Sequence, residues 1–210
     1  MLTSLLDDIL GPSAKLSVLR ILFRQDDLTG REVARRADLS PRAASQALTR
    51  LVEAGVVRRK PAGQAHLFSV NRRRRGAFSA LGELFAAEQG LSGSIGRYVA
   101  KTAGGSCVAV AVFGSYARGT AVSQSDLDVM VLLDDARVAP KVSELFAERA
   151  GAFHDEFGLR LSPYVISTAE FAARFKRNDA LIKAVVREGR VVAGKPLAEV
   201  LADESQEKRR

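Results

Sequence analysis

Apolar residues recur at helical spacing through the first third of the chain. Residues 13–23 follow a Gly-Pro pair and predict an amphipathic helix, with apolar positions at Leu16, Leu19, Ile21, Leu22 and Phe23. Thr29 and Glu32 then have the spacing of a capping box, in which two side chains satisfy the free amides of a first helical turn. A second, short helix is therefore expected to begin at Thr29.

A third helix is predicted to begin at Ser40-Pro41, an N-cap residue followed by proline at the first helical position, and to end at Gly55. The positions expected to face the core are Ala44, Ala47, Leu48 and Leu51. The positions expected to face solvent are Arg42, Ser45, Gln46, Thr49 and Arg50. Two short helices with such a polar second helix are typical of a helix-turn-helix, where Arg reads guanine and Gln reads adenine.

Two β-prone runs follow, at residues 56–59 and 66–70, around a turn that contains Pro61 and Gly63. This pattern predicts a β-hairpin. Basic residues lie on the hairpin and directly after it, where DNA phosphates would lie beside a recognition helix; they are Arg58, Arg59, Lys60 and residues 72–75.

The net charge of +8 is confined to this region. Residues 1–76 hold 15 Lys or Arg against 7 Asp or Glu, whereas residues 77–210 hold 17 of each. A basic first half joined to a neutral second half predicts that the first half binds a polyanion. A basic surface that serves only solubility is the alternative.

Residues 10–72 resemble the winged-helix transcription regulators that include the MarR and ArsR families. The resemblance implies binding of double-stranded DNA and a homodimer. Winged helices also mediate protein contacts, so a protein-binding or structural role is the competing interpretation.

Residues 76–103 keep apolar residues at helical spacing and predict a helical connector, with a possible break between Gly90 and Gly93. Such a stripe is buried against its own domain or pairs across a two-fold axis in a dimer. The pattern alone does not choose between the two arrangements.

The second half begins with an apolar run, residues 107–113, that predicts a buried strand. Gly114-Ser115 follows in a turn where backbone amides and the hydroxyl can hold a phosphate. After ten intervening residues, Asp126 and Asp128 stand two apart on an extended segment, so both carboxylates face one side. Such a pair suits a divalent metal, although solvated turn residues are the plainer interpretation.

This spacing resembles the signature of the DNA polymerase β nucleotidyltransferase superfamily, and in particular the minimal nucleotidyltransferases that include antitoxins. The likeness covers residues 104–195, including the closing stretch 178–194. It implies that Gly114, Ser115 and Arg118 bind the phosphates of a nucleoside triphosphate. It also implies that Asp126 and Asp128 hold Mg²⁺ or Mn²⁺ and are the catalytic residues of an active member.

Active members of this superfamily carry a third carboxylate on a later strand, predicted here at residues 160–166. The expected position holds Ser162, or Arg160 or Pro163 on a shifted alignment, and none of these can act as a base. The loss is expected to weaken transfer chemistry and to spare nucleotide binding. The acidic residues nearby in the sequence that could replace the third carboxylate are Asp134, Asp135, Asp155 and Glu156, and each is predicted in a loop or helix rather than on that strand.

The predicted fold class is α+β with two domains: a winged helix at residues 1–75 and, after the connector, an α/β domain with a mixed sheet at residues 104–195. A helix is expected at residues 140–157, and another, capped by Thr168, is expected to run toward Arg187. Residues 203–210 are expected to be a frayed tail. Cys107 is the only cysteine, which excludes an internal disulfide.

The leading functional hypothesis is a DNA-binding regulator whose second domain binds nucleotide and Mg²⁺, in a toxin–antitoxin or defence operon with a cognate toxin. One alternative is an enzyme that transfers a nucleoside monophosphate to a protein, RNA or small-molecule hydroxyl. Another is a plain repressor with a degenerate second domain. No apolar run nears the roughly 20 residues of a membrane span, and Asp7 and Asp8 are unlike a signal peptide, which predicts a cytoplasmic protein.

Overall fold

The computed structural model describes residues 13–73, 77–122 and 124–207. Within these residues the chain forms two compact units, one reaching Gln89 and the other starting at Gly90. The division falls inside helix α5 (Ala77–Ala103). None of the helices in the described residues has the length and apolarity to cross a membrane.

The N-terminal unit contains helices α2 (Ala14–Arg24), α3 (Gly30–Arg36) and α4 (Pro41–Glu53). Each begins at a side-chain cap, since Ser13, Thr29 and Ser40 accept hydrogen bonds from the amides three residues on. The caps at Thr29 and Ser40 were predicted, and the one at Ser13 was not. Thr29 and Glu32 form the complete capping box. The residues of α4 expected in the core, Ala44, Ala47, Leu48 and Leu51, are all buried, which confirms the predicted orientation of this helix.

The hairpin differs from the prediction in where it turns. Strand β2 (Val57–Ala62) pairs with β3 (Ala65–Val70), so Pro61 lies inside a strand and only Gly63 lies in the turn. Proline is tolerated there because β2 is an edge strand, in the sheet order β1-β3-β2, and needs no amide for a further neighbour. The short strand β1 (Leu28–Thr29), which the sequence pattern did not reveal, pairs with β3.

Helix α5 continues through Gly90 and Gly93 without the break that those glycines suggested. Part of its apolar stripe is buried within the chain, whereas Leu84 is exposed. Phe85 stacks on Phe23 in the core of the N-terminal unit, with ring centroids 4.9 Å apart. Ile95 and Val99 belong to a core of the C-terminal unit.

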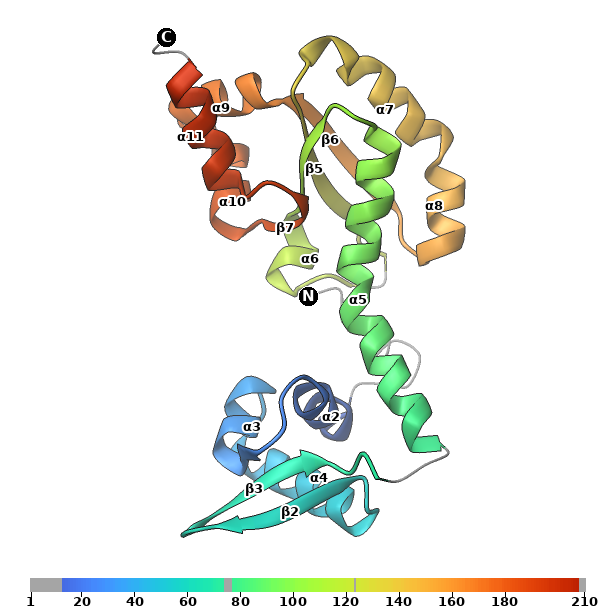
Figure 1. Cartoon of the computed structure of the whole chain (residues 1–210), viewed down its shortest axis with the longest axis vertical. Coiled ribbons are helices and arrows are strands. Elements are labelled where there is room, and N and C mark those ends of the chain that lie inside the picture. Colours follow the sequence, from blue (N-terminus) through green and yellow to red (C-terminus); the bar gives the residue numbers. More distant parts are fainter. Residues whose placement is uncertain (1–12, 74–76, 123, 208–210) are drawn as a thin grey trace. The chain divides into compact units, whose positions relative to one another are not determined.

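The C-terminal unit is built on a mixed sheet in the order β6-β5-β4-β7 (Figure 1). The strands are β4 (Cys107–Val112), β5 (Leu127–Leu133), β6 (Leu161–Ser167) and β7 (Arg190–Gly194). β4 runs antiparallel to β5 and β7, whereas β5 and β6 are parallel. This architecture confirms the predicted α/β domain with a mixed sheet.

Helices cover both faces of this sheet, and alternate residues of the central strands fill two separate cores. Val129 and Val131 of β5 point to the face covered by α5, α7 (Ala139–Glu148) and α8 (Ala150–Phe157). Met130 and Leu132 point to the face covered by α9 (Thr168–Lys176), α10 (Ala180–Glu188) and α11 (Leu197–Glu207). Short helix α6 (Gly114–Arg118) follows β4 and contacts α10.

Several boundaries in this unit correct the predictions. The helix expected over residues 140–157 is divided at Arg149. The cap of α9 is Ser167 rather than Thr168, and the chain leaves the helix at Asn178, which has a φ of 61°. Asp179 then caps α10. The tail expected to fray is helical to Glu207 in α11, whose apolar face packs on α9.

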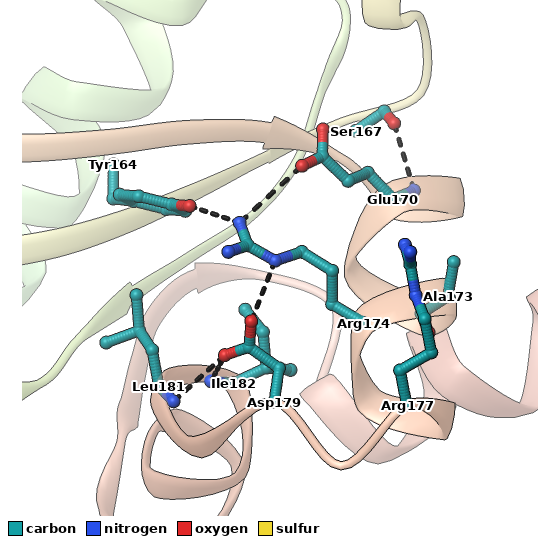
Figure 2. Close-up of polar contacts among 9 residues, drawn as sticks. All are labelled: Tyr164, Ser167, Glu170, Ala173, Arg174, Arg177, Asp179, Leu181 and Ile182. Atoms are coloured by element: carbon teal, nitrogen blue, oxygen red, sulfur yellow. Dashed lines mark hydrogen bonds and ion pairs between the residues drawn. The ribbon is translucent and has the colours of Figure 1, made fainter.

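One arginine joins three elements of this layer (Figure 2). Arg174 of α9 donates to the hydroxyl of Tyr164 on β6 and pairs with Asp179, whose carboxylate lies 3.0 Å from its Nε. Asp179 also accepts from the amides of Leu181 and Ile182 and so caps α10. These bonds hold α10 against β6, and α10 in turn supports α6 at the end of β4.

A buried ion pair joins α5 to α2 in the N-terminal unit. Arg20 donates from Nε and from a terminal nitrogen to the two oxygens of Glu88, at 2.7 and 2.8 Å. The side chain of Glu88 is only 2% exposed. Breaking a buried pair from one side costs more than the pair contributes, because a desolvated charge is left behind.

Replacing Glu88 alone is therefore expected to destabilise the N-terminal unit. Glu88→Ala should lower its free energy of unfolding by about 3–5 kcal/mol, whereas the double variant Arg20→Met/Glu88→Leu should recover most of that loss. The measurement is hydrogen exchange across a urea series, read on α2 peptides for Glu88→Ala and on α11 peptides for the control. Asp203→Ala, which removes the exposed pair with Lys195, is the control and should cost less than about 1 kcal/mol. Equal costs for both single variants would contradict this assignment.

Candidate functional sites

The polar face of α4 is exposed in full. Every residue of the predicted base-reading set is exposed: Arg42, Ser45, Gln46, Thr49 and Arg50. Ser45 and Thr49 line a groove that is closed on its other sides by Arg31 at the start of α3 and by residues of the hairpin. Gln46 and Arg50 face the neighbouring hollow beside the start of α2. The second helix of the helix-turn-helix thus presents hydrogen-bonding groups across its whole outer surface.

The basic residues of the hairpin divide between its two faces. Because strand side chains alternate, Arg59 lies on the face of buried Val57 and lines the groove beside α4. Arg58 and Lys60 lie on the other face. There Arg72 is paired with Asp26 at 3.1 Å, so part of its charge is compensated within the domain. Arg73 also lies on that face, and residues 74 and 75 lie outside the described part of the chain.

In the C-terminal unit, the turn after β4 rests directly on an aspartate of β5. The amide of Phe113 donates to the backbone oxygen of Asp128 at 3.0 Å, and Gly114 follows with a φ of 68°. A Cβ placed at Gly114 would stand 2.2 Å from Oδ2 of Asp128. Only glycine permits both the left-handed conformation and this close approach. The Gly114-Ser115 turn and Asp128 therefore form one continuous site, although they are well separated in the sequence.

The two predicted metal ligands have different surroundings. Asp128 is half-buried, and this burial, followed by the negative charge of Asp126, raises the pKa of its carboxyl group. A hydrogen bond from Ser162 and the charge of Arg118 act in the opposite direction on that pKa. Asp126 is more exposed and forms an ion pair with Arg160, whose Nε lies 2.9 Å from Oδ1.

The register of β5 and β6 shows which residue of β6 lies beside Asp128. Asp128 stands opposite Ser162 in the parallel pair. Asp134 and Asp135 lie beyond the far end of β5, and Asp135 is paired with Arg137. Asp155 and Glu156 are exposed on α8. Among the described residues, no group of three His, Cys, Asp or Glu side chains could hold a metal ion.

Glu188, which no sequence motif indicated, lies close to this site. Its carboxylate accepts from Arg187 and, at 3.4 Å, from Arg118, and both interactions lower its pKa, that of Arg187 more strongly. Arg118, the expected phosphate ligand, is therefore placed between the charges of Asp128 and Glu188. The contact joins α6 to the end of α10, and no local sequence signal indicates it.

Comparison with protein families agrees with both halves of this description. Residues 10–66 match the model of the MarR family. Residues 100–192 match the model described as the nucleotidyltransferase domain. The chain therefore joins a MarR-type winged-helix domain to a nucleotidyltransferase domain, in that order.

Three solved structures resemble part of the chain. A toxin–antitoxin complex with AMP-PNP matches at 19% identity and a TM-score of 0.38, over 57% of this chain and 86% of that one. A mutant of the toxin–antitoxin pair MntA–HpeT matches at 17% identity and a TM-score of 0.38, over 56% of this chain and 86% of that one. A tri-AMPylated Shewanella oneidensis HEPN toxin in complex with MNT antitoxin matches at 17% identity and a TM-score of 0.35, over 58% of this chain and 87% of that one. No curated protein matches the chain. The two family matches, and not these structures, define the class of protein.

The close contact between the Gly114 turn and Asp128 can be tested by stability. Gly114→Ala adds a positive-φ penalty of about 1–2 kcal/mol and also forces the Asp128 carboxylate away from the turn. Gly158→Ala is the matched control, since Gly158 has a φ of 66° but nothing within 4 Å of the added Cβ. Thermal unfolding of both variants should show the larger loss for Gly114→Ala. Equal losses would mean that the turn does not rest on Asp128 as described.

Proposed function

We propose that this protein is a DNA-binding transcriptional regulator whose nucleotidyltransferase domain binds a nucleoside triphosphate together with Mg²⁺ or Mn²⁺. One observation carries the nucleotide half of this function: the Gly114 turn lies directly against the carboxylate of Asp128. A phosphate group held by the turn would be adjacent to a metal held by the aspartates. The MarR-type domain and the exposed polar face of α4 support the DNA half.

DNA binding would use α4 in the major groove and the hairpin beside it. Gln46, Arg42 and Arg50 have the donors and acceptors that read base edges, and Ser45 and Thr49 suit phosphate oxygens. Arg58, Arg59 and Lys60 supply charge for the backbone. The uncompensated charge of the whole chain lies in this half, which supports a nucleic acid rather than a protein as its partner.

The residues of the second domain fit one divalent cation that arrives with a nucleotide. Asp126 and Asp128 offer carboxylate oxygens, which hard cations prefer, and phosphate and water oxygens would complete the shell. When bound, such a cation neutralises phosphate charge. The chain's own residues would hold the phosphates through Gly114, Ser115 and Arg118.

Binding without efficient transfer follows from the residue opposite Asp128. Ser162 cannot accept a proton from an attacking hydroxyl at neutral pH, so the site lacks the base that transfer needs. The second candidate function is an active nucleotidyltransferase that modifies a protein, RNA or small-molecule hydroxyl. The intact pair of Asp126 and Asp128 favours it, because a purely degenerate module would need neither residue.

The proposed biological setting is an autoregulated toxin–antitoxin or defence operon, in a cytoplasmic homodimer with a cognate toxin as partner. Its support is the resemblance of residues 104–195 to minimal nucleotidyltransferases that act as antitoxins. In a dimer, nucleotide could alter the spacing of two α4 helices only if it binds two arrangements with different affinity.

Calorimetry with the four NTPs tests the nucleotide half. The wild-type chain should bind at least one NTP in the presence of Mg²⁺, and Asp126→Asn/Asp128→Asn should weaken that binding by about tenfold or more, since it removes both anionic metal ligands. A label-transfer assay with the bound NTP should detect no product. Product formation would favour the enzyme, and the absence of any binding would refute both nucleotide functions.

Two substitutions separate base reading from backbone binding in the DNA half. Gln46→Ala should lower the binding free energy by about 1–3 kcal/mol on a duplex selected from a random library. It should have little effect on binding to a scrambled duplex. Arg59→Ala should weaken binding to both duplexes alike and reduce the slope of log affinity against log salt concentration by about 1. Fluorescence anisotropy measures both effects. Arg177→Ala, an exposed arginine of the C-terminal unit, is the control, and variants that behave like it would contradict this interface.

A further inference from the structure

Arg160 lies beside the aspartate pair of the nucleotidyltransferase domain. Its backbone oxygen accepts from the amide of Leu127 at 2.7 Å, which fixes the residue beside the aspartate pair. Its side chain reaches Asp126, with Nε 2.9 Å from Oδ1, and donates to the backbone oxygen of Gln124 at 2.7 Å. The guanidinium therefore covers a carboxylate that the proposed function assigns to a metal.

The charges around the aspartate pair nearly cancel. Asp126, Asp128 and Glu188 contribute three negative charges, and Arg118, Arg160 and Arg187 contribute three positive ones. A site with a third carboxylate in place of Ser162 would instead be strongly anionic and would attract a free cation. Because arginine stays protonated at any physiological pH, a cation can take the Oδ1 oxygen of Asp126 only if the guanidinium moves. A free cation therefore has little electrostatic attraction to this site, whereas a polyanion can interact with Arg118 and Arg160.

The pair is easily separated. Its two side chains are 64% and 52% exposed, and exposed ion pairs are worth no more than about 1 kcal/mol. A displaced guanidinium would have its planar donor fork free, and that fork matches the oxygens of a phosphate group. The backbone bond to Leu127 would keep it beside the site.

We propose that Arg160 is a resident cation that holds Asp126 in the ligand-free chain and moves to the nucleotide phosphates on binding. This inference rests on the proposed nucleotide binding. Arg160 then acts as a specificity-determining residue: it opposes binding of a divalent cation alone and favours binding of the cation with a triphosphate. The two ligands enter the site together, and free cations do not accumulate there.

Substitution of Arg160 by glutamine tests this role because it predicts opposite changes for two ligands. Arg160→Gln should bind Mn²⁺ alone about fivefold more tightly, since Asp126 is released, and should bind ATP with Mg²⁺ about tenfold more weakly, since a phosphate contact is lost. Electron paramagnetic resonance of free Mn²⁺ measures the first constant and calorimetry the second. Arg137→Gln is the matched control, since Arg137 forms an exposed pair with Asp135 beyond the other end of β5, and should change neither constant.

The other outcomes are equally informative. Weaker binding of both ligands would overturn the inference in favour of a structural role for Arg160 at Gln124. Tighter or unchanged ATP binding would show that Arg160 only blocks the metal. Failure of the wild-type chain to bind any of the four NTPs would overturn the proposed function and this inference together. Arg160→Lys, which keeps the charge and loses the fork, should show intermediate ATP affinity and serves as the second variant if Arg160→Gln does not fold.

Discussion

The pairing of β5 with its two neighbours decides what the C-terminal domain can do. On one side, β4 brings the Gly114 turn to within contact of Asp128. On the other side, β6 brings Ser162 opposite Asp128 and Arg160 beside Asp126. Because backbone hydrogen bonds fix this register, the chemistry of the site follows from which side chains stand at those few positions.

Under the proposed function, those side chains would bind phosphates and would transfer them poorly. The site has a turn without Cβ, two arginines and two carboxylates, and a serine stands opposite Asp128. The proposed DNA binding belongs to the N-terminal unit, on α4 and the hairpin. Residues of α5 contribute to the cores of both units, and the pair of Arg20 with Glu88 fixes the first half of this helix on α2.

Local signals predicted most of the N-terminal unit and the spacing motif of the C-terminal one. Caps such as Ser40 act within one helical turn, so the sequence alone identifies them. The place of Pro61 could not be predicted in this way, because tolerance for proline depends on β2 being an edge strand. The break at Asn178 and the cap at Ser167 were missed because neighbouring residues offered equally good local signals.

The contacts that give the site its character are those that sequence could not reveal. The pairs of Arg160 with Asp126 and Arg118 with Glu188 join residues brought together only by the sheet and by the packing of α6 on α10. The spacing of Gly114-Ser115 to the aspartates predicted a phosphate and metal site. It did not predict that arginines would already compensate the aspartates.

The most direct test of the division of labour is hydrogen exchange of the whole chain, measured alone, with ATP and Mg²⁺, and with a DNA duplex. ATP should protect peptides that span residues 112–129 and 159–163 and leave α4 unchanged. DNA should protect α4 and the hairpin and leave the exchange of residues 112–129 and 159–163 unchanged. Protection by ATP elsewhere, or by neither ligand at its assigned site, would contradict this account of the protein.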